Sequence, residues 1–539
     1  MSNSLQFRRA GSNGLLIELP DLDATVALFE TIAGAAFDGI EEVIPGARTL
    51  LVQFNSLVVS NDELVRLIGG LESGRRAQSS GQLIEIPVVY DGEDLEFVAA
   101  HLGWSVDQLI SRHRAATFTV AFTGFAPGFA YMTCDDPQLD VPRRESPRVR
   151  IPAGSVAVAG PFCGVYPTDS PGGWQLLGTT PSTMWDLTRE RAALLAPGDR
   201  VRFREISKKD SILAKASVPP SFVQPVAGSG GLRVISTDRP ALYQDTGRHG
   251  CSNQGVSGSG AADHAALRAA NELLGNQFDW AAVEITYGGF ALEAGEPVTC
   301  AVTGAGAPVR IESAQGHIVE VPTGVAFALD AGDILKLGVP MSGVRSYLAI
   351  RGGFEVEKVL GSASTDTLAK LGPAPLKAGD VLLPANKACA SIYPYSLAGP
   401  SLPRGGDLIT IDVVMGPRTD WFTPESVLAF FSQSWTATTE SSRVGVRLQG
   451  AHALLRARQD ELPSEGTCVG SIQVPASGQP VLFLADHPLT GGYPVIAVVA
   501  SHHLSLAAQV PIGCKIRFNP IVDFQVNAKE KNNEKVVDR

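Results

Sequence analysis

The sequence predicts a β-rich α+β protein made of several domains, and two observations support this fold class. Short apolar runs such as LLIEL, LLVQF and IEIPVVY alternate with turns, and the chain contains 56 glycines and 36 prolines. Helical spacing of apolar residues is confined to a few short segments. Because 539 residues exceed what one hydrophobic core can organise, we expect about three or four folding units, arranged in two halves.

The composition excludes some classes of protein. Hydrophobic residues make up 44% of the chain and charged residues 18%, which is typical of a well-packed soluble protein. A net charge of −11 argues against a protein that coats nucleic acid, because such binding relies on clustered Lys and Arg. The N-terminal segment has no apolar signal region, and no apolar run approaches the roughly 20 residues of a membrane span. We therefore expect a cytoplasmic protein.

The first half is expected to contain two units. Residues 1–82 predict a small α+β subdomain, with helices over 23–33 and 61–71 between short strands. Residues 83–206 predict a β-barrel-like unit that carries few helices. Its two helices are expected at residues 94–102 and 105–115.

A linker and a second half follow. Residues 207–231 contain several prolines, end in a Gly/Ser run and predict a flexible linker. Residues 232–520 predict two further β-barrel-like subdomains with one clear helix from Gly260 to Leu274, and residues 521–539 predict a solvated tail. The string LAPGDRVRF near the end of the first half is echoed by VPIGCKIRF near the end of the second. This echo indicates either related halves or a common hairpin pattern.

Two loops of the first half are rich in residues that suit a pocket. GFAPGFAYM (124–132) predicts a tight turn with aromatic faces, for which a structural role is favoured. The segment 147–178 is dense in glycine, proline and hydroxyl groups and carries two arginines. Glycine allows a ligand to approach the backbone closely, and arginine can hold a carboxylate or phosphate. The expected substrate- or anion-binding residues are Arg148, Arg150, Ser155, Tyr166, Ser170, Trp174 and Gln175.

The second half offers candidate catalytic residues on polar turns. Asp245 and Arg248 precede the expected helix, whose N-terminus at Gly260 is expected to attract an anion. Asp486 and His487 could form an acid/base pair, although neighbours in a strand point to opposite faces, so at most one is expected to face a substrate. Alanine at Arg248 or Asp486 is expected to abolish turnover and leave the melting temperature nearly unchanged. The further binding candidates are Ser257, Arg443, Glu465, Gln473, Thr490 and Tyr493.

Several familiar signatures are absent from the sequence. It contains neither a complete GxGxxG fingerprint nor a GxxxxGK[ST] phosphate loop, and it lacks the GxSxG and amidase nucleophile patterns. No Met-Lys-Met biotin attachment site occurs. His502-His503 is interpreted as a surface pair, so no metal site is expected.

The motifs resemble two partner families in series. Through GFAPGFAYM and GVYPTDSPGGWQLLG, the first half resembles the KipI family, also called the B subunit of 5-oxoprolinase or allophanate hydrolase subunit 1. Through QDTGRHG, SEGTCVGSIQVP and TGGYPV, the second half resembles KipA, or the C subunit of 5-oxoprolinase. The resemblance covers residues 12–520. It implies cyclophilin-like β-barrels, an architecture shared with the carboxyltransferase region of urea carboxylases.

The resemblance also implies a function and its alternatives. The chain is expected to be a fused B and C component of ATP-dependent 5-oxoprolinase, a hydrolase that works with a separate A subunit on the small carboxylate 5-oxoproline. One alternative is a regulator that binds a sensor histidine kinase, although fusing an inhibitor to its antagonist would make a poor switch. The other is the carboxyltransferase component of a biotin-dependent, urea-type carboxylase. ATP is the nucleotide that the resemblance implies.

Overall fold

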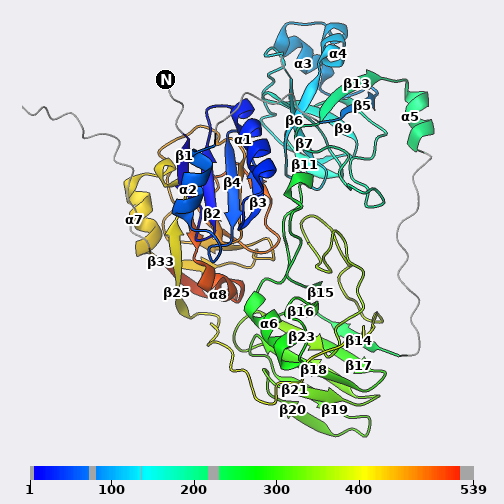
Figure 1. Ribbon diagram of the computed structural model, residues 1–539, viewed down its shortest axis with the longest axis vertical. Helices are drawn as coiled ribbons and strands as arrows, with labels where there is room; N and C mark the ends of the chain where they lie inside the picture. Colours follow the sequence, from blue (N-terminus) through cyan, green and yellow to red (C-terminus); the bar gives the residue numbers. More distant parts are fainter. Residues whose placement is uncertain (1–4, 72–80, 135, 216–229, 522–539) are drawn as a thin grey trace, which may run out of the picture.

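The computed structural model describes residues 5–71, 81–134, 136–215 and 230–521, which form four β-rich parts (Figure 1). The expected β-rich α+β class is confirmed, since most helices are short and every part is organised around a sheet. No helix among the described residues is long and apolar enough to cross a bilayer.

The N-terminal part is a four-stranded antiparallel sheet with helices α1 (Leu22–Ala35) and α2 (Asn61–Gly69) on one face. Helix α1 begins where the Asp21 side chain accepts a hydrogen bond from the Ala24 amide at 2.8 Å. Alternate residues of a strand face opposite sides, so Leu15 packs under the helices while Leu16 faces away from them. The strand order is β1 (Gln6–Arg9), β2 (Gly14–Glu18), β4 (Thr49–Phe54) and β3 (Ile40–Pro45).

The rest of the first half is a nearly closed barrel. A bridge between Val89 and Thr179 joins the edges of its seven-stranded sheet. Helices α3 (Leu95–Leu102) and α4 (Val106–Ala115) pack against this sheet, and a two-stranded ribbon of β8 (Arg148–Ile151) and β11 (Ser170–Gly172) extends from it. The sheet order is β12 (Gln175–Thr179), β9 (Ser155–Ala159), β10 (Phe162–Val165), β7 (Ala130–Cys134), β6 (Phe118–Thr123), β13 (Arg200–Glu205) and β5 (Leu83–Val88).

The second half opens with two sheets that share one hydrophobic core. Helix α6 (His264–Leu273) packs on the second of them. The first sheet has the order β20 (Ile318–Val321), β19 (Val309–Glu312), β22 (Ile334–Leu337), β17 (Phe290–Ala294), β14 (Leu232–Thr237) and β24 (Val381–Leu382). The second has the order β15 (Ala241–Gln244), β16 (Ala282–Thr286), β23 (Arg345–Ile350), β18 (Val298–Gly304) and β21 (Ala326–Leu329).

A closed seven-stranded barrel ends the second half, flanked by α7 (Pro424–Ser432) and α8 (Leu504–Ala508). Its order is β25 (Leu408–Met415), β32 (Val495–Val499), β29 (Ser471–Gln473), β30 (Val481–Phe483), β27 (Gly445–Gln449), β26 (Trp435–Ala437) and β33 (Lys515–Pro520). In both barrels the first and last strands pair in parallel, β5 with β13 and β25 with β33. The two echoed sequence strings end in β13 and β33, so they occupy equivalent places in the two barrels.

The two halves are interleaved rather than merely tethered. The N-terminal sheet lies against the closed barrel of the second half (Figure 1), where Leu16, Ile44 and Leu51 pack with Leu489. The amide of Ala47 donates a hydrogen bond to the Ser464 carbonyl at 2.8 Å. Arg418 of the barrel forms ion pairs with Glu18 of the sheet and with Glu465. The chain therefore folds back so that residues 5–71 contact the closed barrel of the second half.

Two sequence expectations need correction here. The helix expected from Gly260 begins at His264 instead, because Gly260 has φ +93°, and the Asp263 carboxylate caps the helix by accepting from the Ala266 amide at 3.0 Å. That carboxylate fills the proposed anion site. The expected linker 207–231 opens with helix α5 (Lys208–Lys215). Its residues 216–229 and the tail residues 522–539 lie outside the described part. We propose domain boundaries near residues 82, 206 and 231.

Candidate functional site

A large cavity lies where the parts of the fold meet. Its volume is about 1220 Å³, and its walls come from the N-terminal sheet region, the first barrel and the closed barrel, with Leu368 from the two-sheet part. Phe125, Tyr131 and Phe162 form an apolar wall from the first barrel, and Phe483 and Tyr493 line the cavity from the closed barrel. Both halves of the chain thus build one site.

The loop that joins β6 to β7 fixes one wall of the cavity. At Gly124 an added Cβ would lie 2.3 Å from Thr490 Oγ1, so this close approach of the two halves requires glycine. The Gly128 amide donates to the Gln254 carbonyl at 2.9 Å, which anchors the loop on the second half a second time. Phe125 has φ +66°, a left-handed conformation that is rare for a side chain of its size, and it is 41% exposed. The loop therefore holds Phe125 at the cavity in a strained conformation.

An aromatic cluster supports this wall from behind. Phe129 makes edge-to-face contacts with Tyr131, Tyr166 and Trp174, at ring-centroid distances of 5.0, 5.3 and 5.4 Å. Tyr166 and Trp174 were expected to bind a ligand, but they are buried in this cluster and do not line the cavity. Their role is to shape the wall that Tyr131 and Phe125 present.

Charged groups also line the cavity. Arg143 pairs with Glu461 at 3.1 Å, which bridges the first barrel and the closed barrel. Arg447 lies within 3.8 Å of Glu440. Arg48 is exposed, and among the described residues its side chain forms neither a hydrogen bond nor an ion pair. The cavity therefore contains an unpaired guanidinium group that can bind a carboxylate or phosphate.

Three of the expected binding residues line this cavity, namely Gln473, Thr490 and Tyr493. They come from β29, β31 (Thr490–Gly491) and the turn after it, and β31 pairs with β28 (Glu465–Gly466). Glu465 of β28 is buried, and both its oxygens accept from Arg418. Glu465 therefore holds Arg418, which pairs with Glu18 of the first half, and Glu465 does not line the cavity.

The expected catalytic residue Asp486 lies in a buried ionic network outside the cavity. Arg443 donates to both oxygens of Asp486 at 3.0 Å and also pairs with Glu284 of the preceding sheet. Ser259 and Thr367 donate to the same carboxylate at 2.7 and 2.6 Å. Burial by itself would raise the pKa of Asp486, but the charge of Arg443 and the hydrogen bonds from Arg443, Thr367 and Ser259 together outweigh burial and lower the pKa. Asp486 and Arg443 thus join the closed barrel to the preceding two-sheet part.

His487 follows Asp486 in a turn, not in a strand, and is also buried. Its Nδ1 lies 3.2 Å from Thr467 Oγ1, and its ring stacks on Phe483 at 5.9 Å between centroids. Burial lowers the pKa of His487, so its neutral form is favoured. Asp486 and His487 are therefore buried away from the cavity, and they cannot act there as an acid/base pair.

Asp245 and Arg248 form a second buried group. Asp245 accepts hydrogen bonds from the hydroxyls of Ser362 and Ser364 and from the Ala363 amide, at 2.6, 2.5 and 2.7 Å. The Arg248 Nε donates to the Val359 carbonyl at 3.1 Å, and burial lowers its pKa. These contacts fix the loop 359–366 against the loop ahead of α6.

Ser257 lies 3.4 Å from Asp366 in the same region. Burial, and then the charge of Asp486, raise the pKa of Asp366 to about 6. The residues expected to be catalytic therefore lie close to one another. They are buried in the protein interior and do not line the cavity.

The other expected residues of the first half lie on or near the β8–β11 ribbon, apart from the cavity lining. Arg148 pairs with Asp94 at 2.9 Å, and Arg150 pairs with Asp169 at 2.6 Å. Gln175 is buried, and its Nε2 donates to the Pro142 carbonyl at 3.1 Å. The hydroxyls of Ser155 and Ser170 donate to nearby backbone carbonyls. These contacts are local and stabilise the ribbon and its base.

Comparison with known proteins identifies the family. The carboxyltransferase domain, subdomains C and D, matches residues 5–195, and its subdomains A and B match residues 254–520. The chain is 37% identical to the 5-oxoprolinase C subunit of Escherichia coli (strain K12) over 290 residues, which cover 53% of this chain and 90% of the relative. It is 43% identical to the 5-oxoprolinase B subunit of Escherichia coli O157:H7 over 168 residues, which cover 30% of this chain and 77% of the relative.

A solved structure shares nearly the whole fold. The crystal structure of TTHA0988 superimposes with a TM-score of 0.80 at 34% identity, and the match covers 95% of this chain and all of that one. The urea amidolyase of Saccharomyces cerevisiae is 33% identical over 293 residues, but these span only 16% of its length. The chain therefore belongs to the carboxyltransferase-domain family of the 5-oxoprolinase B and C subunits, with a half that resembles the B subunit followed by a half that resembles the C subunit.

Proposed function

We propose that the chain is the fused B and C component of ATP-dependent 5-oxoprolinase, which opens the lactam of 5-oxoproline to glutamate together with a separate A subunit. The names of relatives that match each half support this proposal. The observation that carries it is the shared cavity, because both halves build its walls and Arg48 brings an unpaired cation into it.

The lining of the cavity suits a small lactam that carries a carboxylate. Arg48 would bind the carboxylate, and the Phe125 and Phe162 side chains would pack against the ring. Gln473 and the Tyr493 hydroxyl can exchange hydrogen bonds with the lactam amide. These residues would hold and orient the ring and exclude water from its apolar edge.

The resemblance implies ATP as the source of free energy, since amide resonance makes uncoupled hydrolysis of a lactam slow. The chain has no phosphate loop, but the arginines of the cavity are groups that suit a phosphoryl anion. A separate A subunit is the proposed partner, because the relatives are named as subunits. None of the relatives described above has a name that refers to a histidine kinase, so the regulator alternative gains no support.

The test is a reconstitution. The purified chain is mixed with a protein that resembles the 5-oxoprolinase A subunit, and ATP hydrolysis is measured with and without 5-oxoproline. We expect 5-oxoproline-dependent release of phosphate and glutamate that requires both proteins. Mixtures that lack either protein are the controls, and the absence of 5-oxoproline-dependent turnover in the complete mixture would contradict the proposal.

A urea-type carboxyltransferase is the second candidate. The family name and the likeness to urea amidolyase favour it. The substrate separates the two functions, because urea has no carboxylate for Arg48 to bind. Turnover of urea with a biotin carboxylase partner, and none of 5-oxoproline with the A subunit, would establish this alternative.

A further inference from the structure

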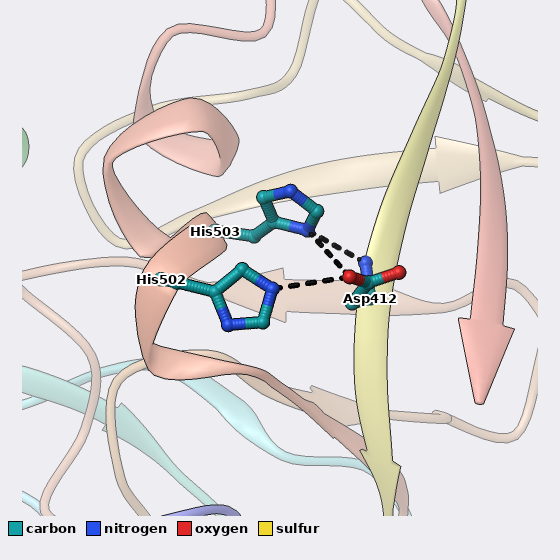
Figure 2. A group of neighbouring side chains, drawn as sticks. All are labelled: Asp412, His502 and His503. Carbon is teal, nitrogen blue, oxygen red and sulfur yellow. Dashed lines mark hydrogen bonds and ion pairs between the residues drawn. The ribbon is translucent and has the colours of Figure 1, made fainter. Parts of the chain in front are cut away.

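Three potential metal ligands meet on the outside of the closed barrel. Asp412 lies on β25, while His502 and His503 lie in the short 3-10 helix η3 (Ser501–His503), 90 residues further along the chain. Figure 2 shows both imidazole rings turned toward the Asp412 carboxylate. Among the described residues, these three side chains form a group whose ligand atoms all lie within 4.8 Å of one another. None of them lines the large cavity.

The spacing of the ligand atoms fits a small divalent ion. His502 Nε2 lies 3.0 Å from Asp412 Oδ2, and His503 Nδ1 lies 3.7 Å from the same oxygen. Zinc binds nitrogen and oxygen ligands at about 2.0–2.2 Å, so neighbouring ligands of a tetrahedral site stand about 3.3 Å apart. The distances of the two imidazole nitrogens from Asp412 Oδ2, 3.0 and 3.7 Å, lie on either side of this value.

The surrounding contacts orient two of the ligands. Asn519 of β33 donates to Asp412 Oδ1 at 2.8 Å, which leaves Oδ2 facing the imidazoles. The Asp412 amide donates to His503 Nδ1 at 2.9 Å, so this nitrogen is unprotonated and its lone pair points toward β25. An ion bound here would replace this hydrogen bond and the proton shared between His502 and Asp412.

We propose that Asp412, His502 and His503 bind one divalent transition-metal ion of the zinc class, with water completing its coordination. Two imidazoles and one carboxylate are ligands that zinc, nickel and copper accept, whereas magnesium and calcium prefer oxygen ligands alone. The His502 side chain is 56% exposed, so the site is open to solvent and to an entering ion.

The position of the site gives metal binding a structural consequence. Helix η3 leads directly into α8, whose end docks the barrel on the preceding two-sheet part. Gln509 accepts from the Val344 and Arg345 amides at 2.8 and 2.9 Å. A metal ion between β25 and η3 would therefore tie this docking segment to the barrel wall and stabilise the fold.

The test uses the untagged full-length chain, freed of metal with a chelator that is then removed. Titration with Zn²⁺ in a calorimeter is expected to show saturable binding of one ion and a rise in Tm, while Mg²⁺ produces neither. We expect His502→Ala and His503→Ala each to lose this binding, and Asn519→Ala to weaken it by about 10-fold. His452→Ala removes an exposed histidine of the same barrel and should bind as the unchanged chain does.

Circular dichroism of each variant shows whether it is folded. Asp412→Asn is a further variant of the site, because asparagine preserves the shape of the aspartate side chain. The inference is overturned if the unchanged chain binds no Zn²⁺, or if folded His502→Ala and His503→Ala bind Zn²⁺ with undiminished affinity. Its outcome is independent of the proposed enzymatic function, because the readouts are metal stoichiometry and Tm.

Discussion

At the scale of single residues, polar side chains of this protein serve two separate purposes. Arg48 faces the cavity without a partner, whereas Asp486 and Arg443 satisfy each other inside the protein. Removing one member of a buried ion pair leaves an uncompensated charge, which is strongly unfavourable. Exposed pairs such as Arg310 with Glu320 lack this effect because water screens them.

The first residue-scale prediction concerns Asp486. Asp486→Asn should lower the free energy of unfolding by about 3–5 kcal/mol, because buried Arg443 loses one of its two charge partners and keeps only Glu284. This prediction differs from the sequence-based expectation that alanine at Asp486 would leave the melting temperature nearly unchanged. Urea denaturation measures the effect, and Glu320→Gln in the exposed pair is the matched control. A variant as stable as the unchanged chain would show that the pair is dispensable.

The second residue-scale prediction concerns pH. The pKa of Asp366 rises from 3.8 when unfolded to about 6 in the fold, so the folded protein holds a proton that the unfolded chain releases. Stability from this group is present below about pH 4 and is lost as the pH rises toward 6. Asp366→Asn should therefore raise Tm at pH 8 and have little effect at pH 4.

Thermal unfolding of the Asp366→Asn variant between pH 4 and pH 8 checks this sign. Both hydrogen bonds that Asp366 Oδ1 accepts, from the Leu368 and Ala369 amides, can be accepted by the asparagine oxygen. Asp140→Asn, at an exposed position, is the control. A lower Tm for Asp366→Asn at pH 8 would mean that the ionised carboxylate stabilises the fold.

At the scale of elements, the sequence predicted most helices. It did not predict a helix start that depends on tertiary contacts. Helices α3 and α4 lie within one residue of their expected bounds, and the Ser105 side chain caps the start of α4. The helix start at Gly260 was wrong because apolar spacing cannot show that Gly260 packs against the Gly247 backbone. The residues Gln473, Thr490 and Tyr493 were predicted from their glycine-rich turns, and the structure places them in the cavity.

Polar residues on other turns were also expected to face a cleft, but some of them are buried. Asp486 and Gln473 both lie near turns between barrel strands, and only the partner across the fold decides which one faces solvent. Arg48 was missed because it lies in the turn between β3 and β4, where no local motif marks it. Its place in the cavity lining beside the closed barrel depends on the docking of the N-terminal sheet, where the Ala47 amide bonds to the carbonyl of Ser464, more than 400 residues away in sequence.

The element-scale prediction concerns the loop between β6 and β7. Gly124→Ala places a methyl group 2.3 Å from Thr490 Oγ1, which should destabilise the chain by about 1–3 kcal/mol and displace Phe125. The double variant Gly124→Ala/Thr490→Ala should recover part of the loss, because it removes the clashing oxygen. Thermal unfolding measures both, and Gly34→Ala, where a Cβ meets nothing within 4 Å, is the control. Equal stability of the Gly124→Ala variant and the unchanged chain would contradict this account of the loop.

At the scale of the whole molecule, contacts between the halves matter more than the segment that connects them. The N-terminal sheet packs on the closed barrel through Leu16, Ile44 and Leu489, and Arg418 joins Glu18 to Glu465. Such an arrangement explains how two proteins named as separate subunits elsewhere can be similar to one chain here.

The prediction at this scale is that the connection can be cut. Residues 1–215 and 230–539, expressed as two chains, should purify together as a one-to-one complex, because the buried contacts between the halves are retained. Size-exclusion chromatography with light scattering gives the stoichiometry, and Arg418→Ala should weaken the complex. Two independently migrating halves would contradict the interleaved arrangement.

The central claim is that the shared cavity recognises the carboxylate of a lactam through Arg48, and one comparison tests it most directly. ATP hydrolysis by the reconstituted protein is measured with 5-oxoproline and with 2-pyrrolidinone, the same lactam without its carboxylate, for the unchanged chain, for Arg48→Ala and for the exposed control Arg66→Ala. The account predicts that Arg48→Ala raises KM for 5-oxoproline by roughly 10- to 100-fold, as expected for a lost charge-assisted hydrogen bond, and leaves 2-pyrrolidinone unaffected. An unchanged KM for 5-oxoproline in Arg48→Ala, or an equal loss with both lactams, would contradict it.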